Sequence, residues 1–378
     1  MSTYLEERIE WYDHNYRMGT PLINDDQFDK LEANLYRVNP EANYFSKKSI
    51  LPLPSLAKDR IEEFIEGLLP DTRLIIEPKI EGVAIDSDTG EEINRIRLDS
   101  PKDNYEEILS KVVEVINNLT SKSSNYTVGI GMPGSIHPET NLVQVSNTKA
   151  LEGMPVKSDI EKKLGYEIKI ANDADCLALS EAVDGAGKDY KSVFAVILGT
   201  GVGAGYSYDK KIIVGPNKLT GEWGQNPIPG PMDDYEKSVK RHCGRIGAIE
   251  VFLSGPGLEN YYEHITKSKI SSREIVSLYQ KNDLVAEEVM DVYFERIARS
   301  FSTFVNILDP DIIVCGGGMS EIDGIYDEVP KRIIPYIASN FFLTPIVSAT
   351  HGSSSGVRGA AHLWNWRTKS YLFQYSSF

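Results

Sequence analysis

The stretch Glu167-Ile-Lys-Ile-Ala-Asn-Asp-Ala-Asp-Cys-Leu-Ala-Leu-Ser-Glu-Ala-Val183 indicates the fold class of this chain. Residues 167–171 predict a strand and residues 174–183 a helix. The polar group Asn172-Asp-Ala-Asp175 lies where the strand ends and the helix begins. A carboxylate at the C-terminal edge of a strand faces the ligand crevice in α/β folds. A lone Asp there is more often an N-cap, and both roles are possible in this cluster.

Strands and helices alternate on both sides of this stretch. Residues 126–132 predict a strand that enters Pro133-Gly134, and an amphipathic helix is expected over 104–119. A buried strand is expected over 193–198, and a long helix with Asp283 as its N-cap precedes a strand over 311–315. Such alternation predicts an α/β domain. The first 70 or so residues are instead polar and helical, with a change of texture near Arg73.

Composition places the chain among soluble globular proteins. It has 378 residues, 41% hydrophobic and 25% charged, and a net charge of −15. That charge argues against a general nucleic-acid-binding surface, which needs clustered Lys and Arg. We expect a cytoplasmic protein with no membrane partner, because no secretory signal, membrane-length apolar run or disulfide framework is visible. The three cysteines (Cys176, Cys243 and Cys315) lack metal-ligand spacing.

Two glycine-rich turns follow apolar strands. The first runs from Gly199 through Thr200 and Gly201 to Gly203, and the second is Gly316-Gly317-Gly318. Closely spaced glycines let backbone N–H groups approach phosphate oxygens. Each turn alone can equally be a tight hairpin or a plain strand-to-helix turn. The presence of two in one α/β chain favours nucleotide binding.

The segment after Gly221 is rich in Gly and Pro. Its polar residues Glu222, Gln225 and Glu250 look like solvated loop residues when read alone. Cys243 beside His242 is a poor metal site, since two adjacent ligands cannot complete a tetrahedral zinc shell.

Taken together, the motifs resemble the ROK family of sugar kinases, and within it the bacterial fructokinases. The resemblance extends from about Val83 to Trp366. Its matching strings are Gly129-Ile-Gly-Met-Pro-Gly-Ser135, Ala171-Asn-Asp-Ala-Asp-Cys-Leu-Ala178, Ser180-Glu-Ala-Val-Asp-Gly185, Gly221-Glu-Trp-Gly224, Leu253-Ser-Gly-Pro-Gly257, Asn306-Ile-Leu-Asp-Pro-Asp311 and Ser355-Gly-Val-Arg-Gly-Ala-Ala361.

The resemblance implies a two-lobed ribonuclease-H-like (actin-like ATPase) α/β fold, with sugar and Mg-ATP in the cleft between the lobes. It implies that Asp173 is the general base that deprotonates a sugar hydroxyl as it attacks the γ-phosphate. The same resemblance implies a homodimer, with fructose phosphorylated to fructose 6-phosphate. It assigns sugar contacts to Asn147, Asn172, Glu222, Gln225 and Glu250. It matches residues 199–203 to the family's second phosphate loop and residues 316–318 to its adenosine-side loop.

Two features depart from the family pattern. The family's zinc site has one His and three Cys, but here Gln225, Arg241 and Ala248 replace three of them and only Cys243 remains. We therefore expect zinc to be lost. The family's first phosphate loop, Asp-x-Gly-Gly-Thr-Lys, is replaced by Glu77-Pro-Lys-Ile-Glu-Gly82, in which Glu77 is a candidate for the missing Asp. Losing preorganised phosphate donors predicts impaired catalysis.

Residues from about Leu5 to Ile85 resemble a second family, the NAD-dependent DNA ligases. Glu77-Pro-Lys79-Ile-Glu81-Gly82 matches the adenylation motif of that family, in which the Lys is the nucleophile. The remaining nucleotidyltransferase motifs are absent after Ile85. We therefore expect a fusion with three parts: a ligase-like helical head over 1–72, a first kinase lobe over 73–185 and a second lobe over 186–378.

Four functions compete on this sequence. An ATP-dependent hexose kinase of fructokinase type is favoured, and a sugar- or nucleotide-binding pseudokinase is the alternative. NAD-linked nucleotidyl chemistry at Lys79 ranks below both. A ROK-type transcriptional repressor is disfavoured because Asp25, Asp26 and Asp29 in the head would repel DNA phosphates.

Overall fold

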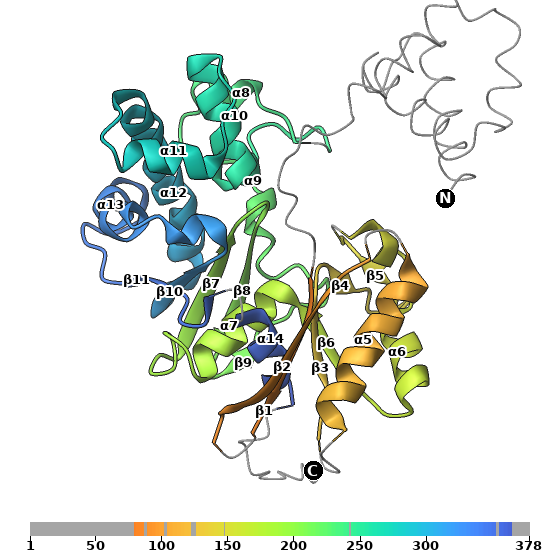
Figure 1. Ribbon diagram of the computed structural model, residues 1–378. Helices are drawn as coiled ribbons and strands as arrows, with labels where there is room; N and C mark the ends of the chain where they lie inside the picture. The colour runs from red at the N-terminus through yellow and green to blue at the C-terminus, as the bar shows by residue number, and fades with distance from the viewer. Residues whose placement is uncertain are drawn as a thin grey trace, which may run out of the picture. The chain divides into compact units, whose positions relative to one another are not determined.

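A computed structural model describes residues 79–364, apart from 87–88, 102–103, 122–125, 147, 242 and 353–354 (Figure 1). Every described residue belongs to the unit that spans 77–378. The expected head over 1–72 lies outside the described residues, as do Glu77 and Asn147. The side chain of Lys79 is not described either.

The described residues form a five-stranded sheet with the order β11-β10-β7-β8-β9 (Figure 1). The central strand β7 runs antiparallel to β8 and parallel to β10, which is parallel to β11. The strands span Ser192–Leu198 (β7), Val202–Tyr208 (β8), Lys211–Ile212 (β9), Ile312–Gly316 (β10) and Ile346–Ser348 (β11). This mixed sheet confirms the predicted strands over 193–198 and 311–315 to within a residue.

Seven helices accompany this sheet in the described part that follows β9. They span Asp234–Ser238 (α8), Glu250–Leu253 (α9), Gly255–Thr266 (α10), Ser272–Tyr279 (α11), Leu284–Leu308 (α12), Gly324–Arg332 (α13) and Ser355–His362 (α14). The long helix α12 begins as predicted, because the Asp283 side chain accepts a hydrogen bond of 3.0 Å from the Ala286 N–H. It ends where Asp309 adopts a left-handed conformation.

Successive side chains of β7 point to opposite faces of the sheet. Both sets are apolar, and helices cover both faces. Phe194, Val196 and Leu198 pack in a large core that contains the buried face of α12. Val193 and Ala195 pack in a second core against helix α7, which spans Asp173–Val183. Fully burying one such apolar side chain contributes about 1.5–3 kcal/mol. The sheet is therefore held between α12 on one face and α7 on the other.

The elements before α7 pack around a separate core. Ile108, Leu109 and Ile116 of α5 meet Val156 and Ile160 of α6 in this core. The elements span Lys79–Ile85 (β1), Glu92–Asp99 (β2), Tyr105–Thr120 (α5), Gly129–Met132 (β3), Ser135–Ile136 (β4), Val143–Gln144 (β5), Val156–Leu164 (α6) and Lys169–Asn172 (β6). Strands β3 and β6 are parallel, and β1 and β2 are antiparallel. The predicted helix over 104–119 is thus confirmed, with Asn104 as its N-cap.

Helix α14 packs directly on α7. Gly359 of α14 lies so close that a Cβ there would be 1.7 Å from the carbonyl oxygen of Cys176. Only glycine allows this backbone approach. The contact joins residues 183 positions apart in the sequence, and Figure 1 shows the two helices side by side.

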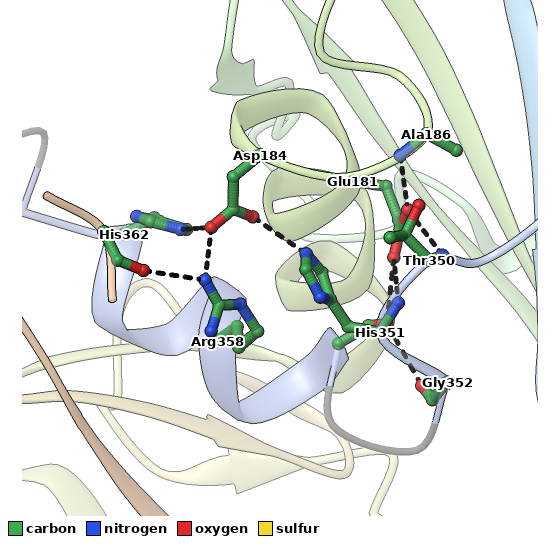
Figure 2. Close-up of polar contacts among 10 residues, drawn as sticks. Glu181, Asp184, Ala186, Thr350, His351, Gly352, Arg358 and His362 are labelled. Carbon is green, nitrogen blue, oxygen red and sulfur yellow. Dashed lines mark hydrogen bonds and ion pairs between the residues drawn. The ribbon is translucent and has the colours of Figure 1, made fainter. Parts of the chain in front are cut away.

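The C-terminal end of α7 is fixed to α14 and to the residues before it by the buried Glu181 and the half-buried Asp184 (Figure 2). Glu181 accepts hydrogen bonds from the Thr350 N–H at 3.1 Å and the Ser355 hydroxyl at 2.9 Å. Asp184 pairs with the Arg358 guanidinium at 2.6 Å and with His351 at 3.2 Å. Burial raises the pKa of Asp184, but hydrogen bonds from His362 and Arg358 outweigh it and hold that pKa well below its ordinary value.

No helix among the described residues is both long enough and apolar enough to span a bilayer.

The Asp184 contacts predict a measurable loss of stability. We expect Asp184→Asn to lower the free energy of unfolding by about 2 kcal/mol, because Arg358 loses a largely buried anionic partner. A lowered native pKa stabilises the fold above the unfolded pKa, so the difference from wild type should narrow below about pH 4. Urea unfolding at several pH values measures both effects. Asp189→Asn, an exposed change in the loop after α7, is the control and should be neutral; an equal loss in both variants would contradict the prediction.

Candidate active site

The turn from β6 into α7 presents the two central residues of the predicted site. Asn172 is the last residue of β6 and the N-cap of α7, since its side-chain oxygen accepts from the Ala174 N–H at 2.8 Å. Its amide nitrogen donates to the Gly134 carbonyl at 3.1 Å. Asp173 is the first residue of the helix. Asn172 therefore takes the N-cap role that the sequence had left open. The Asp173 carboxyl lies at the N-terminus of the helix.

A pocket lies next to this turn. It brings together Asn172 and Asp175 from the β6–α7 turn and Glu222 from a distant loop. The other lining residues are Gly134, Ser135, Ile136, Ile170, Ala171, Val214, Lys218 and Thr220. Polar and apolar groups thus converge on one concave surface, as expected for a small polar ligand.

The carboxylates at this pocket affect one another. Asp173 is exposed, but protein atoms around its carboxyl group partly desolvate it and so raise its pKa. Burial, and next the charge of Asp173, raise the pKa of Asp175 to about 7. Burial and the charge of Glu250 raise the pKa of Glu222. Raised carboxyl pKa values clustered at a pocket are typical of a catalytic site.

Glu222 is oriented by an unusual backbone position. The preceding Gly221 has φ +84° and lies against β8, where a Cβ would be 1.7 Å from the Ala204 carbonyl oxygen. A glycine is therefore required directly before Glu222. Glu222 then begins the short 3₁₀ helix Glu222–Gln225 and lines the pocket. It is half-buried there, which differs from the solvated loop position expected from local sequence alone.

Two other predicted sugar contacts lie beside the pocket lining. Gln225 ends the 3₁₀ helix and its side chain hydrogen-bonds to Glu222. Glu250 begins α9, and its Oε2 accepts from the Val202 N–H at 3.3 Å. Glu250 therefore contacts the turn between β7 and β8.

Two charged residues of the pocket lining, Asp175 and Lys218, were not among the predicted site residues. Asp175 belongs to the quoted motif and lies three residues after Asn172, which is one helical turn on the same face. That spacing was the available signal. Lys218 gave none: it comes from the loop after β9, and its place in the lining depends on how this loop folds back.

The predicted phosphate loop over residues 199–203 is a hairpin turn. Gly199, Thr200 and Gly201 connect β7 to β8, with a hydrogen bond of 3.0 Å from the Gly199 N–H to the Gly201 carbonyl. Gly203 lies within β8. The positions that a Cβ would occupy at Gly199 and Gly203 have no atom within 4 Å. The backbone at these two positions therefore lies beside open space.

The predicted adenosine-side loop over residues 316–318 is a tight turn after β10. Gly316 ends the strand, and Gly317 has φ +86° with space for a Cβ blocked at 2.4 Å by the Leu198 carbonyl. Gly318 begins the 3₁₀ helix Gly318–Glu321 and faces open space. The turn thus opens a short 3₁₀ helix, with α13 following at Gly324.

The residues at the family's zinc positions do not fit zinc. Ala248 is buried and has no donor atom, and Arg241 carries a positive charge that pairs with Glu250. Gln225 is a weak ligand, so Cys243 is the single good donor. In the described part of the chain, no group of three His, Cys, Asp or Glu side chains could hold a metal ion.

Comparisons with known proteins identify the family. The ROK family model matches residues 78–367. An N-acetyl-D-glucosamine kinase of Vibrio parahaemolyticus is 36% identical over 274 residues, which cover 71% of this chain and 90% of that protein. The chain therefore belongs to the ROK family.

Solved structures show the same fold. A ROK hexokinase from Thermus thermophilus has a TM-score of 0.66 at 21% identity, covering 75% of this chain and 97% of that one. A Streptomyces griseus ROK glucokinase, solved with glucose and AMPPNP, has a TM-score of 0.61 at 21% identity, covering 76% and 99%. The predicted ribonuclease-H-like (actin-like ATPase) sugar-kinase fold is thus confirmed.

Substitution of Gly317 and of Gly318, in the loop after β10, should affect stability differently. Gly317→Ala should destabilise the protein by about 2 kcal/mol or more, because alanine meets both a positive φ and the Leu198 carbonyl. Gly318→Ala should change the free energy of unfolding by less than about 0.5 kcal/mol, since its Cβ enters open space. Denaturant unfolding of both variants measures the difference. Equal stabilities would show that the turn tolerates a side chain at Gly317.

Proposed function

We propose that the protein transfers the γ-phosphoryl group of ATP to a hydroxyl of a hexose. The observation that carries the proposal is the Asp173 carboxyl, which begins α7 beside the pocket lined by Asn172 and Glu222. Family membership supports sugar kinase chemistry at this place. The nearby carboxylates and amide offer hydrogen-bond acceptors and a donor to sugar hydroxyls.

Asp173 would act as the general base. Its carboxylate takes the proton of the hexose hydroxyl, the hydroxyl oxygen bonds to the γ-phosphorus, and the bond to the bridging oxygen of ADP breaks. A raised pKa strengthens the carboxylate as a proton acceptor near neutral pH. The Gly199–Gly203 and Gly316–Gly318 segments would lie against the ATP phosphates and the nucleoside. Mg²⁺ would enter with ATP and neutralise phosphate charge.

For the hexose, we propose N-acetyl-D-glucosamine ahead of fructose. The Vibrio parahaemolyticus relative of that name is 36% identical to this chain over most of its own length. Fructose, the sugar expected from the sequence, is the competing candidate. Binding of a sugar without turnover, caused by the replaced first phosphate loop, is the second function to be tested.

Replacing the base should abolish turnover without abolishing binding. Asp173→Asn should lower kcat by about a hundredfold to ten thousandfold, because general base catalysis is lost. Sugar should still raise its Tm. In the wild type, kcat/KM should rise with pH through a pKa above the ordinary Asp value. Coupled ADP release, with the exposed change Asp189→Asn as control, measures this; unchanged turnover in Asp173→Asn would refute the assignment.

A sugar panel tests the proposed substrate. With ATP and Mg²⁺, we expect kcat/KM for N-acetyl-D-glucosamine to exceed that for fructose, mannose and glucose by at least about tenfold, the range that pocket contacts commonly supply. Higher efficiency with fructose would restore the sequence-based prediction. If sugars raise Tm but no ADP forms with any of them, the protein is a binding pseudokinase.

A further inference from the structure

A small hairpin directs Arg241 toward an acidic cluster, which consists of Asp173, Asp175, Glu222 and Glu250. Residues Lys240 and Ile246 form an antiparallel bridge, and the Arg241 N–H donates to the Arg245 carbonyl at 2.8 Å. The base of the hairpin is closed by a bond of 3.0 Å from the Gly247 N–H to the Val239 carbonyl. These backbone bonds fix the start of the Arg241 side chain.

The Arg241 guanidinium makes two contacts from this position. Its Nε donates to Glu250 Oε1 at 2.9 Å, and Nη1 donates to Cys243 Sγ at 3.6 Å. The Arg241 and Glu250 side chains are 15% and 22% exposed, so the ion pair is largely withdrawn from solvent. A guanidinium holds such a geometry better than a flexible ammonium, because its donors form a planar fork.

Glu250 passes this restraint on to the glycine turn. While Oε1 is held by Arg241, Oε2 accepts from the Val202 N–H, directly after Gly201. A Cβ at Gly201 would lie 3.1 Å from that same Oε2. The Glu250 carboxylate therefore lies between the hairpin and the turn that joins β7 to β8.

We infer that Arg241 is a positioning residue for the sugar site. Its ion pair with Glu250 connects the 240–246 hairpin, which lacks the family's zinc ligands, to the Gly199–Gly203 segment. The inference rests on the proposed function, because it gives Glu250 a place in that site. An ion pair thereby replaces a metal staple in this chain. Arg241 acts through Glu250 and is not a catalytic residue.

The charge of Arg241 also acts on the neighbouring acid Glu222. Glu250, Arg241, Asp173 and Gln225 act on the pKa of Glu222, and Arg241 is the cation among these four. Asp175 and a second cation, Lys218, line the same pocket as Glu222. Removing it would leave the repulsion between carboxylates uncompensated and raise the pKa of Glu222 further. Sugar binding that needs an ionised Glu222 would then begin at a higher pH.

A double-mutant cycle tests the inference in the full-length protein. Arg241→Met, Glu250→Gln and the double variant are compared for N-acetyl-D-glucosamine affinity by calorimetry, for KM and kcat, and for Tm. We expect Arg241→Met to weaken sugar binding by about tenfold, with a coupling to Glu250→Gln of a few-fold or more. The acid limb of sugar binding should move to higher pH, and Arg241→Lys should restore part of the affinity.

Arg245→Met is the matched control, because it removes an exposed arginine of the same hairpin. It should leave sugar affinity and its pH dependence unchanged. Independent effects of the Arg241 and Glu250 changes, or a fall in Tm without a change in affinity or pH dependence, would overturn the inference. If the wild-type protein binds sugar but does not turn it over, the proposed kinase activity is refuted. The double-mutant cycle, measured as sugar affinity, would still decide the role of Arg241. A wild type that binds none of the panel sugars would overturn both.

Discussion

The anchoring of helix α7 is the constraint on which the site depends. Its C-terminal end is tied by Glu181 and Asp184 to α14 and the preceding residues, and its middle touches α14 backbone to backbone. One face of the helix packs on the central sheet. The Asp173 carboxyl at its first residue is therefore held by packing, and by the Glu181 hydrogen bonds and Asp184 ion pairs at the other end of the helix.

The site concentrates negative charge around one pocket. Asp173, Asp175, Glu222 and Glu250 would repel one another in the absence of ligand, and burial intensifies the repulsion. Raised pKa values are one response, and the cations Arg241 and Lys218 are the other. A neutral, hydroxyl-rich ligand suits such a site, because it donates hydrogen bonds to carboxylates without adding charge.

Local sequence predicted the regular elements well and the site less completely. The Asp283 cap and the strand before Gly316 follow rules that act over a few residues, so they could be read directly. The β6–α7 turn was also found, because a strand and a helix bracket its polar residues. Lys218 and the Arg241–Glu250 pair could not be found, because their positions depend on long-range folding of loops. Glu222 was recognised through family resemblance, and its structural reason is the missing side chain of Gly221.

The three cysteines of the chain differ sharply in exposure. Cys176 and Cys315 are buried, whereas Cys243 is exposed at the tip of the 240–246 hairpin. A thiol-reactive dye added to the native protein therefore meets one accessible sulfur. That sulfur lies two residues from Arg241, on a segment in contact with the acidic cluster. The natural sequence thus offers a ready optical probe, without any engineered residue, for watching this loop when sugar or nucleotide is added.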